Sequence, residues 1–169
     1  LRSIIDTGMV DGVALMDVTM NDPRIELAQL SSIPLISIGH PMNEINVPCI
    51  DTDFIEMGEM IMQTLCRNGH SRILFAGGKE IDYERNGGAN YLIRLRASMH
   101  DAAARYKIHI DEEFTDEDDF DAAENLLERF ISSENTAIVT QGGPLFLNNL
   151  VAATRQRGMK IPQDLSLIS

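Results

Sequence analysis

The pattern of apolar and polar positions from Val47 to Gly78 predicts an extended segment, an amphipathic helix and a buried strand. Apolar or small residues recur every three or four positions in the middle of this stretch, as on one face of a helix: Ile55, Gly58, Ile61, Met62 and Leu65. Gly69 follows them, where helices commonly end in a left-handed residue. The run Ile73–Ala76 is continuously apolar, which is typical of a strand covered on both faces. This order indicates a βαβ crossover, the building unit of a parallel sheet.

Strands and helices alternate along the rest of the chain as well. Short apolar runs predict strands at Val13–Met16, Leu35–Ile38, Ala137–Val139 and Leu165–Ile168. Periodic segments predict helices at Arg2–Thr7, from Pro23, and over Asn90–Tyr106, Asp121–Ile131 and Leu145–Arg157. Ile108 and Ile110 suggest one more short strand, and we expect the acidic block Asp111–Phe120 to form a solvated loop. The order predicts an α/β fold with doubly wound parallel sheets.

Composition and charge limit the classes of function. The 169 residues are 44% hydrophobic, which suffices for the core of one or two small lobes. The net charge is -12, and no stripe of basic residues is present, so this stretch is a poor candidate for binding a phosphate backbone itself. No apolar run approaches the ~20 residues of a membrane span, so we expect no membrane partner.

The reactive residue types do not form a recognisable catalytic or metal-binding pattern. Cys49 and Cys66 lack C-x-x-C spacing, and we expect two buried thiols, with a disulfide as the less favoured alternative. The histidines lack metal-ligand spacing, and His70 is better explained as a side chain that fixes a loop. Neither a nucleophile elbow nor a phosphate-loop spacing is present. The sequence therefore predicts no enzyme, no metal and no cofactor.

The same segments resemble the LacI/GalR family of bacterial transcription factors. The resemblance rests on VDGVALM at Val10–Met16, IPLISIG at Ile33–Gly39, Asp53 at a helix start, the pair Gly69-His70 and the closing run GMKIPQDLSLIS. Members of this family join a DNA-binding headpiece to a two-lobed, periplasmic-binding-protein-like core. The resemblance implies part of the N-terminal lobe in residues 1–50 and the C-terminal lobe, without its closing segment, in residues 51–169. The fold would then be incomplete in this chain, and the headpiece would be absent from it.

The resemblance also implies three ligand-binding residues. Arg94 matches the family's arginine that points into the sugar crevice, although alone it could be a solvated helix residue. Phe114 lines up with an aromatic residue that packs against ligand, and a core phenylalanine is the alternative. Gln141 follows a strand at the end where open α/β sheets bind ligands, and a polar turn residue is the alternative.

One departure from the family bears on the ligand. The family has Asn-Asp after this strand, where the asparagine contacts ligand and the aspartate caps the next helix, but this chain has Gly142-Gly143. Losing a cap typically costs ~1 kcal/mol. The change implies either a ligand other than a simple hexose or a weakened effector response.

By resemblance, the chain is expected to be the effector-binding and dimerisation core of a cytoplasmic DNA-binding regulator, usually a repressor. Its partners would be a sugar or nucleoside-like effector, operator DNA through the headpiece, and a second copy in a homodimer. A periplasmic sugar-binding protein of a transport system is the alternative, and a secretory signal would distinguish it. A doubly wound enzyme is a third possibility, for which we find no nucleophile–base pair.

Overall fold

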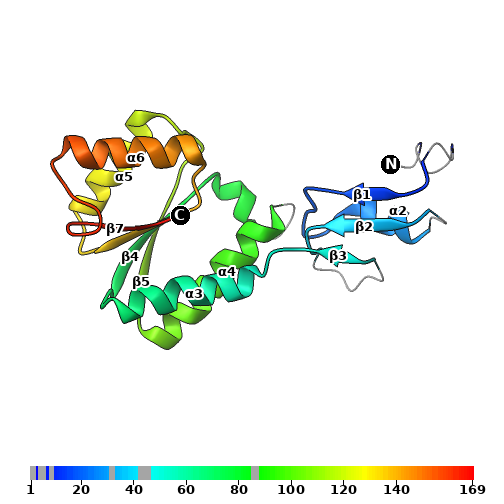
Figure 1. Ribbon diagram of the computed structural model, residues 1–169, viewed down its shortest axis with the longest axis horizontal. Coiled ribbons are helices and arrows are strands. Elements are labelled where there is room, and N and C mark those ends of the chain that lie inside the picture. The colour runs from blue at the N-terminus through cyan, green and yellow to red at the C-terminus, as the bar shows by residue number, and fades with distance from the viewer. Residues whose placement is uncertain (1–2, 4–6, 8–9, 31–32, 42–46, 85–87) are drawn as a thin grey trace. The chain divides into compact units, whose positions relative to one another are not determined.

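The computed structural model describes residues 3, 7, 10–30, 33–41, 47–84 and 88–169 (Figure 1). The helix expected over Arg2–Thr7 lies mostly outside these residues. The chain divides into two compact units, and each contains a parallel sheet. Unit 1 is formed by Leu1–Phe54 and Ile81–Arg96, and unit 2 by Ile55–Glu80 and Ala97–Ser169. The predicted α/β class with parallel sheets is confirmed, and the predicted lobe boundary after residue 50 stays a prediction about the longer protein.

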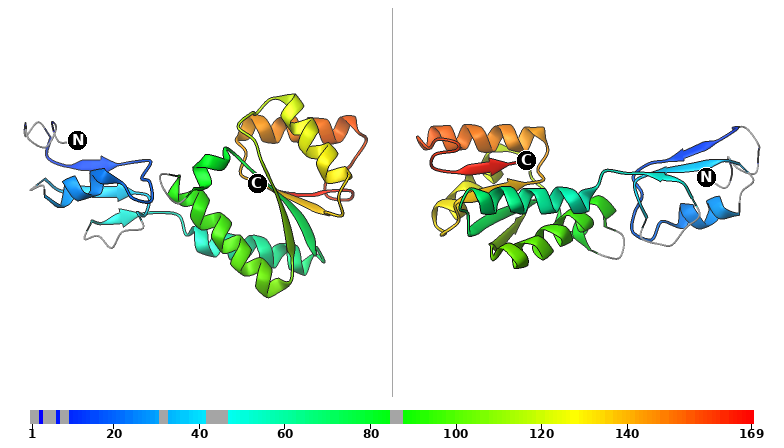
Figure 2. Two further views of the ribbon diagram at one scale, coloured as in Figure 1. Left: turned by 180° about the vertical axis from the view of Figure 1, so that it is seen from behind. Right: turned by 60° about the horizontal axis from the view of Figure 1, so that its bottom comes forward.

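Unit 1 is built on three parallel strands in the order β1-β2-β3. They are β1 (Val13–Leu15), β2 (Leu35–Ile38) and β3 (Cys49–Ile50). The helix α2 (Pro23–Gln29) covers one face of this sheet (Figure 2). A small core joins them, made of Leu15, Val18 and Ile25 with Val13, Leu35 and Val47 packed around it. Because side chains alternate between the faces of a strand, the neighbours of these residues must point away from α2.

The opposite face of the unit 1 sheet is apolar and open. Ile38 and Ile50 lie side by side in the register of β2 and β3, and they are 46% and 65% exposed. Ala14 and Ile36 are paired on β1 and β2 in the same alternation, and neither is buried. Parallel sheets normally bury both faces, so this face has the composition of an interior surface without a cover among the described residues.

Unit 2 is a three-layer structure with a four-stranded parallel sheet in the order β5-β4-β6-β7. The strands are β4 (Arg72–Gly77), β5 (His109–Phe114), β6 (Ala137–Thr140) and β7 (Ser166–Ile168). Figure 1 shows α5 (Phe120–Ile131) and α6 (Pro144–Gln156) on one face and α3 (Phe54–Arg67) with the later part of α4 (Asn90–Tyr106) on the other. Leu74 and Ala76 pack against α5 and α6, and all residues of β6 are buried.

The predicted βαβ crossover around α3 is wrong in one respect. The strand β3 pairs with β2 in unit 1, whereas β4 belongs to the sheet of unit 2. A strand–helix–strand pattern reports the order of elements and does not report which sheet each strand joins. The predicted end of α3 is confirmed, because Gly69 has φ +82° and the N–H of His70 donates to the carbonyl oxygen of Leu65 at 3.0 Å.

The expectation of a solvated loop for the acidic block is wrong for its first four residues. Asp111 to Phe114 continue β5, in register with Leu74 to Gly77 of β4. Parallel pairing overrides the low strand propensity here because each carboxylate finds a cation or a polar partner. Asp111 pairs with Arg72, Glu112 with His100, and Glu113 with Arg129.

The expectation of buried thiols is also wrong. Cys49 and Cys66 are both exposed and free. Cys49 lies on the two-residue edge strand β3, and Cys66 lies outside the buried stripe of α3, which consists of Gly58, Met62 and Leu65. Ile55, which the sequence pattern placed on the apolar stripe of this helix, is 60% exposed.

Gly58 sets the closeness of the α3–α4 contact, and we predict that Gly58→Ala destabilises the protein. A Cβ at this position would lie 2.6 Å from the Ser98 hydroxyl oxygen, which itself donates to the carbonyl of Ile55 at 2.6 Å. The expected loss in the free energy of unfolding is about 1–3 kcal/mol, measured by urea titration. Gly78→Ala is the control, since no atom lies within 4 Å of its Cβ. Equal stability of both variants would contradict the close contact.

Gly143 begins α6 without a side-chain cap, and we predict that Gly143→Asp stabilises the protein. Gly143 has the extended backbone of a cap residue (φ -63°, ψ 172°), and an added Cβ meets nothing within 4 Å. Asp119 shows the interaction that is missing, because its carboxylate accepts from the N–H of Ala122 at 2.9 Å at the start of α5. The expected gain over Gly143→Ala is ~1 kcal/mol in thermal unfolding. No gain over alanine would show that the α6 terminus cannot accept a cap.

Candidate functional site

A cavity of about 420 Å³ lies at the carboxyl ends of the three strands of unit 1. Its wall is formed by the segments that follow β1, β2 and β3, together with η1 (Glu80–Tyr83) and the first residues of α4. Loops after parallel strands meet at one edge of a sheet, and this edge is where open α/β folds bind ligands. The position therefore makes this cavity the candidate site.

A buried ion pair holds the loop after β1 in place. Asp22 is 3% exposed, and its carboxylate accepts from the backbone N–H of Arg24 at 2.9 Å and from the guanidinium at 2.6 Å. The guanidinium also donates to the carbonyl oxygens of Met16 and Asp17, at 3.0 and 2.9 Å. These bonds keep Asp17 at φ +50° in the cavity wall. The Arg24 side chain, by hydrogen bonding, lowers the pKa of the Asp22 carboxyl from its ordinary value.

Arg94, the first predicted ligand residue, lies on α4 and is bound to the cavity wall through a carboxylate. Its guanidinium donates to Asp51 at 2.6 Å, and its side chain is 17% exposed. Asp51 lines the cavity and also accepts from the backbone N–H groups of His40 and Thr52, at 3.1 and 2.9 Å. Arg94 is therefore ion-paired and mostly covered, while direct ligand contact by Arg94 stays a prediction.

Asn90 is a cavity residue that the sequence analysis used only to mark the start of α4. It is 3% exposed, and neither its amide nitrogen nor its amide oxygen has a hydrogen-bond partner in the described part of the chain. An unsatisfied buried polar group costs about 1–3 kcal/mol, so such groups need an explanation. An asparagine at a helix start is common as a cap, which is why the sequence alone did not single it out.

Two aromatic rings add an apolar surface to the same cavity. The rings of Phe54 and Tyr91 are 5.7 Å apart at 41°, and both residues line the wall. Phe54 is the first residue of α3, directly after Asp53. Its ring gives the candidate site part of its apolar wall.

Phe114 and Gln141, the other predicted ligand residues, belong to unit 2. Phe114 ends β5, and its ring meets Phe75 edge-on at 6.2 Å. Gln141 follows β6, and its backbone N–H donates to Ala76 at 3.0 Å. Since β5 and β6 flank β4, both residues lie at the carboxyl edge of one sheet. Phe114 also lines a small cavity of about 180 Å³ there. Their contact with a ligand stays a prediction.

The side chain of Phe146 leaves no room for a Cβ at position 142. A Cβ on Gly142 would lie 2.4 Å from the Cδ1 atom of Phe146, which is 3% exposed. The ring therefore fills the space that a side chain at position 142 would occupy. Phe146 is part of the unit 2 core, so a larger residue at position 142 would require repacking of that core.

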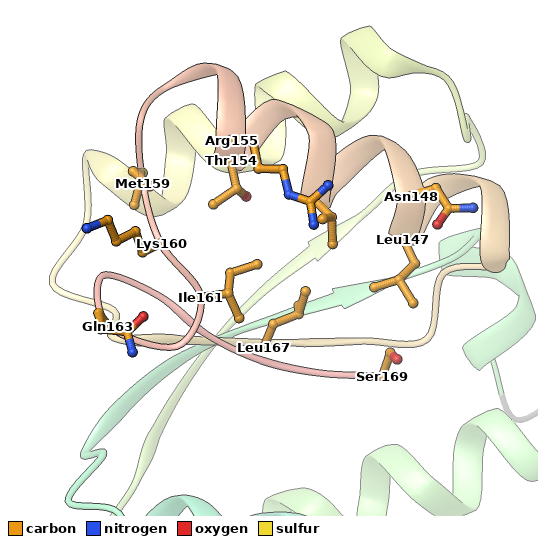
Figure 3. A pocket seen from close by; sticks show the side chains of 11 residues that line it. Leu147, Asn148, Thr154, Arg155, Met159, Lys160, Ile161, Gln163, Leu167 and Ser169 are labelled. Atoms are coloured by element: carbon orange, nitrogen blue, oxygen red, sulfur yellow. The ribbon is translucent and has the colours of Figure 1, made fainter.

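Two larger cavities in unit 2 lack the features of the candidate site. One of about 710 Å³ lies between α6 and β7, and Figure 3 shows Leu147 and Ile161 among its lining side chains. Another of about 610 Å³ lies at the amino ends of the strands, where His70 and Thr136 share a 2.8 Å hydrogen bond. That bond confirms the loop-fixing role expected of His70.

The described residues contain no group of three or more potential metal ligands close together. Among them, no helix combines the length and apolar character that crossing a membrane requires.

We predict that Asp22→Asn destabilises the protein in a pH-dependent way. Because the folded state lowers the pKa of Asp22, its stabilisation is present above the unfolded pKa of about 4 and is lost as the pH falls through the lower folded value. The expected loss near neutral pH is roughly 2 kcal/mol in the free energy of unfolding, and it shrinks in acid. Asp11→Asn, at an exposed position in the same unit, is the control. A loss that does not vary with pH would contradict the ion pair.

No protein-family model matches the chain, but comparison with known proteins finds similar transcriptional regulators. The chain is 29% identical to the HTH-type transcriptional regulator AglR of Rhizobium meliloti over 99% of its length, and it covers 46% of that protein. It is 22% identical to catabolite control protein A of Staphylococcus xylosus, of which it covers 47%. The chain thus spans about half the length of these curated relatives.

A solved structure shows the same fold. The crystal structure of a LacI family transcriptional regulator from Bifidobacterium animalis subsp. lactis matches 98% of the chain with a TM-score of 0.82 at 22% identity, and the match covers 59% of that structure. The regulator names of AglR and of this structure agree with the expectation of a regulator rather than an enzyme. The chain is therefore similar over nearly its whole length to bacterial transcriptional regulators, and its fold is that of part of a LacI family regulator.

Proposed function

We propose that the chain binds a sugar or nucleoside-like effector in the unit 1 cavity and so controls DNA binding by a longer regulator. The observation that supports this most directly is Asn90, a buried amide with two unused hydrogen-bonding atoms in the cavity wall. A polyhydroxylated ligand offers donors and acceptors to both atoms at once. The cost of the unpaired amide in the free protein would be recovered when ligand binds.

The remaining contacts are proposed from their positions. The rings of Phe54 and Tyr91 suit the apolar face of a sugar or a base. Arg94 uses one nitrogen for Asp51, and the guanidinium fork leaves further donors for a hydroxyl. In unit 2, Phe114 and Gln141 are proposed as ligand contacts at the carboxyl edge of the sheet.

The partners of the whole regulator are proposed as well. The net charge of -12 favours DNA contact through another segment, a headpiece that docks as a homodimer on a palindromic operator. The open apolar face with Ile38 and Ile50 supports further protein over unit 1, as does the coverage of about half of each relative. Ligand would act by favouring one arrangement of the dimer, which is a population shift.

We predict that Asn90→Ala weakens effector binding without destabilising the free protein. The full-length protein is screened by thermal shift with neutral sugars and nucleosides, and affinity is measured by calorimetry. The expected loss in affinity is about tenfold, because the ligand loses its buried partner. Stability of the ligand-free variant should not fall, since the amide makes no hydrogen bond to lose. Asn68→Ala is the control for affinity, at an exposed position that directly follows α3 and does not line the cavity; its amide donates only to the carbonyl oxygen of Thr64 at 2.8 Å.

The same protein tests the regulator hypothesis. Selection from random duplexes should enrich palindromic sites, and the stabilising ligand should change their affinity for the wild type more than for Asn90→Ala at a given concentration. Failure to enrich any DNA, together with a secretory signal in the longer protein, would favour the periplasmic-binding alternative. An Asn90→Ala variant that loses stability but keeps ligand affinity would show that the amide is structural.

A further inference from the structure

We infer that the unit 1 cavity selects effectors that carry a positively charged amine and rejects phosphorylated ones. This inference rests on the proposed function of the cavity and names the class of ligand that it takes. Three aspartates line the wall, Asp17, Asp51 and Asp82, and among the described residues they carry more charge than the basic side chains beside them.

The count of charges at the wall is negative. Asp51 is neutralised by Arg94, whose guanidinium lies 2.6 Å from its carboxylate. Within the described residues, neither a salt bridge nor a side-chain hydrogen bond engages the carboxylates of Asp17 and Asp82. Arg24 is paired with Asp22 at 2.6 Å and is also attracted by the carboxylate of Asp17, so one guanidinium is shared between two carboxylates. Among the described residues, the carboxylates of Asp17, Asp22, Asp51 and Asp82 are balanced by only the two guanidinium groups of Arg24 and Arg94, which leaves a net charge of about minus two at and behind the wall.

The start of α4 adds a positive potential to the cavity, but this potential is weaker than the negative potential of the carboxylates. Asn90, Tyr91 and Leu92 lie in the wall, so the positive end of the helix dipole is directed at the cavity. That end is equivalent to about half of an elementary charge. Two carboxylates exceed it several-fold, so the potential in the cavity stays negative and an anionic ligand is repelled.

Two further groups suit an ammonium. The faces of Phe54 and Tyr91 carry the negative side of the aromatic quadrupole, which attracts a cation and not an anion. The unpaired amide oxygen of Asn90, which is 3% exposed, can accept a hydrogen bond from an N–H. This buried and unpartnered oxygen is independent of the acidic residues and points to a ligand that donates.

The test compares matched ligands on the full-length protein. Glucose, glucosamine and glucose phosphate form one series, and the galactose and mannose series provide the same three groups on other scaffolds. In whichever series binds, the amine is expected to bind roughly fivefold to tenfold more tightly than the neutral sugar, and the phosphate more weakly than either. The preference for the amine should fall at high salt.

Asp82→Asn identifies the source of the preference. The variant is expected to lose roughly fivefold in affinity for the amine and to keep the affinity for the neutral sugar, whereas Asp11→Asn should change neither. Equal affinities for amine and neutral sugar, or tightest binding of the phosphate, would overturn this inference and leave the proposed function standing. Absence of binding in all series and with all nucleosides would overturn both.

Discussion

Parallel pairing of backbone strands is the constraint on which the rest of this chain depends. Strands that run in one direction bring their carboxyl ends to a single edge, so the loops after them share that edge whatever their distance in sequence. In unit 1 the residues after β1 and after β3 meet the start of α4 in this way. The ion pair of Asp22 and Arg24 then fixes the first of these loops. The cavity thus follows from topology, and its chemistry follows from a few side chains.

The two parallel sheets have their faces buried to different degrees. The unit 2 sheet has helices on both faces, and β4 and β6 are almost completely buried. Among the described residues, α2 covers one face of the unit 1 sheet, and Ile38 and Ile50 are exposed on the other. An exposed isoleucine forgoes about 2 kcal/mol of burial. Covering this face would therefore stabilise unit 1 more than any further contact would stabilise the unit 2 sheet.

Local periodicity in the sequence predicted the helices well, but it predicted less well which strands pair with one another. The limits of α4, Asn90 to Tyr106, follow from apolar spacing and are confirmed. The extension of β5 through Asp111–Phe114 was missed because its carboxylates are stabilised by residues distant in sequence, such as Arg72. The role of Asn90 was missed for a similar reason. Its lack of partners is a property of the folded neighbourhood, and no sequence pattern encodes an absent hydrogen bond.

Side-chain packing decides where polar groups are available at the strand ends of the two units. In unit 2, Phe146 fills the space beside Gly142, so a polar side chain cannot return there without repacking the core. In unit 1, Phe54 brings a ring into the cavity, and Asn90 carries an unpaired amide. A buried polar group kept without a partner is tolerated in a stable fold when the cost is recovered in another state, and ligand binding supplies such a state. Among the described residues of the unit 1 cavity, the Asn90 amide is therefore the polar group that most needs a partner.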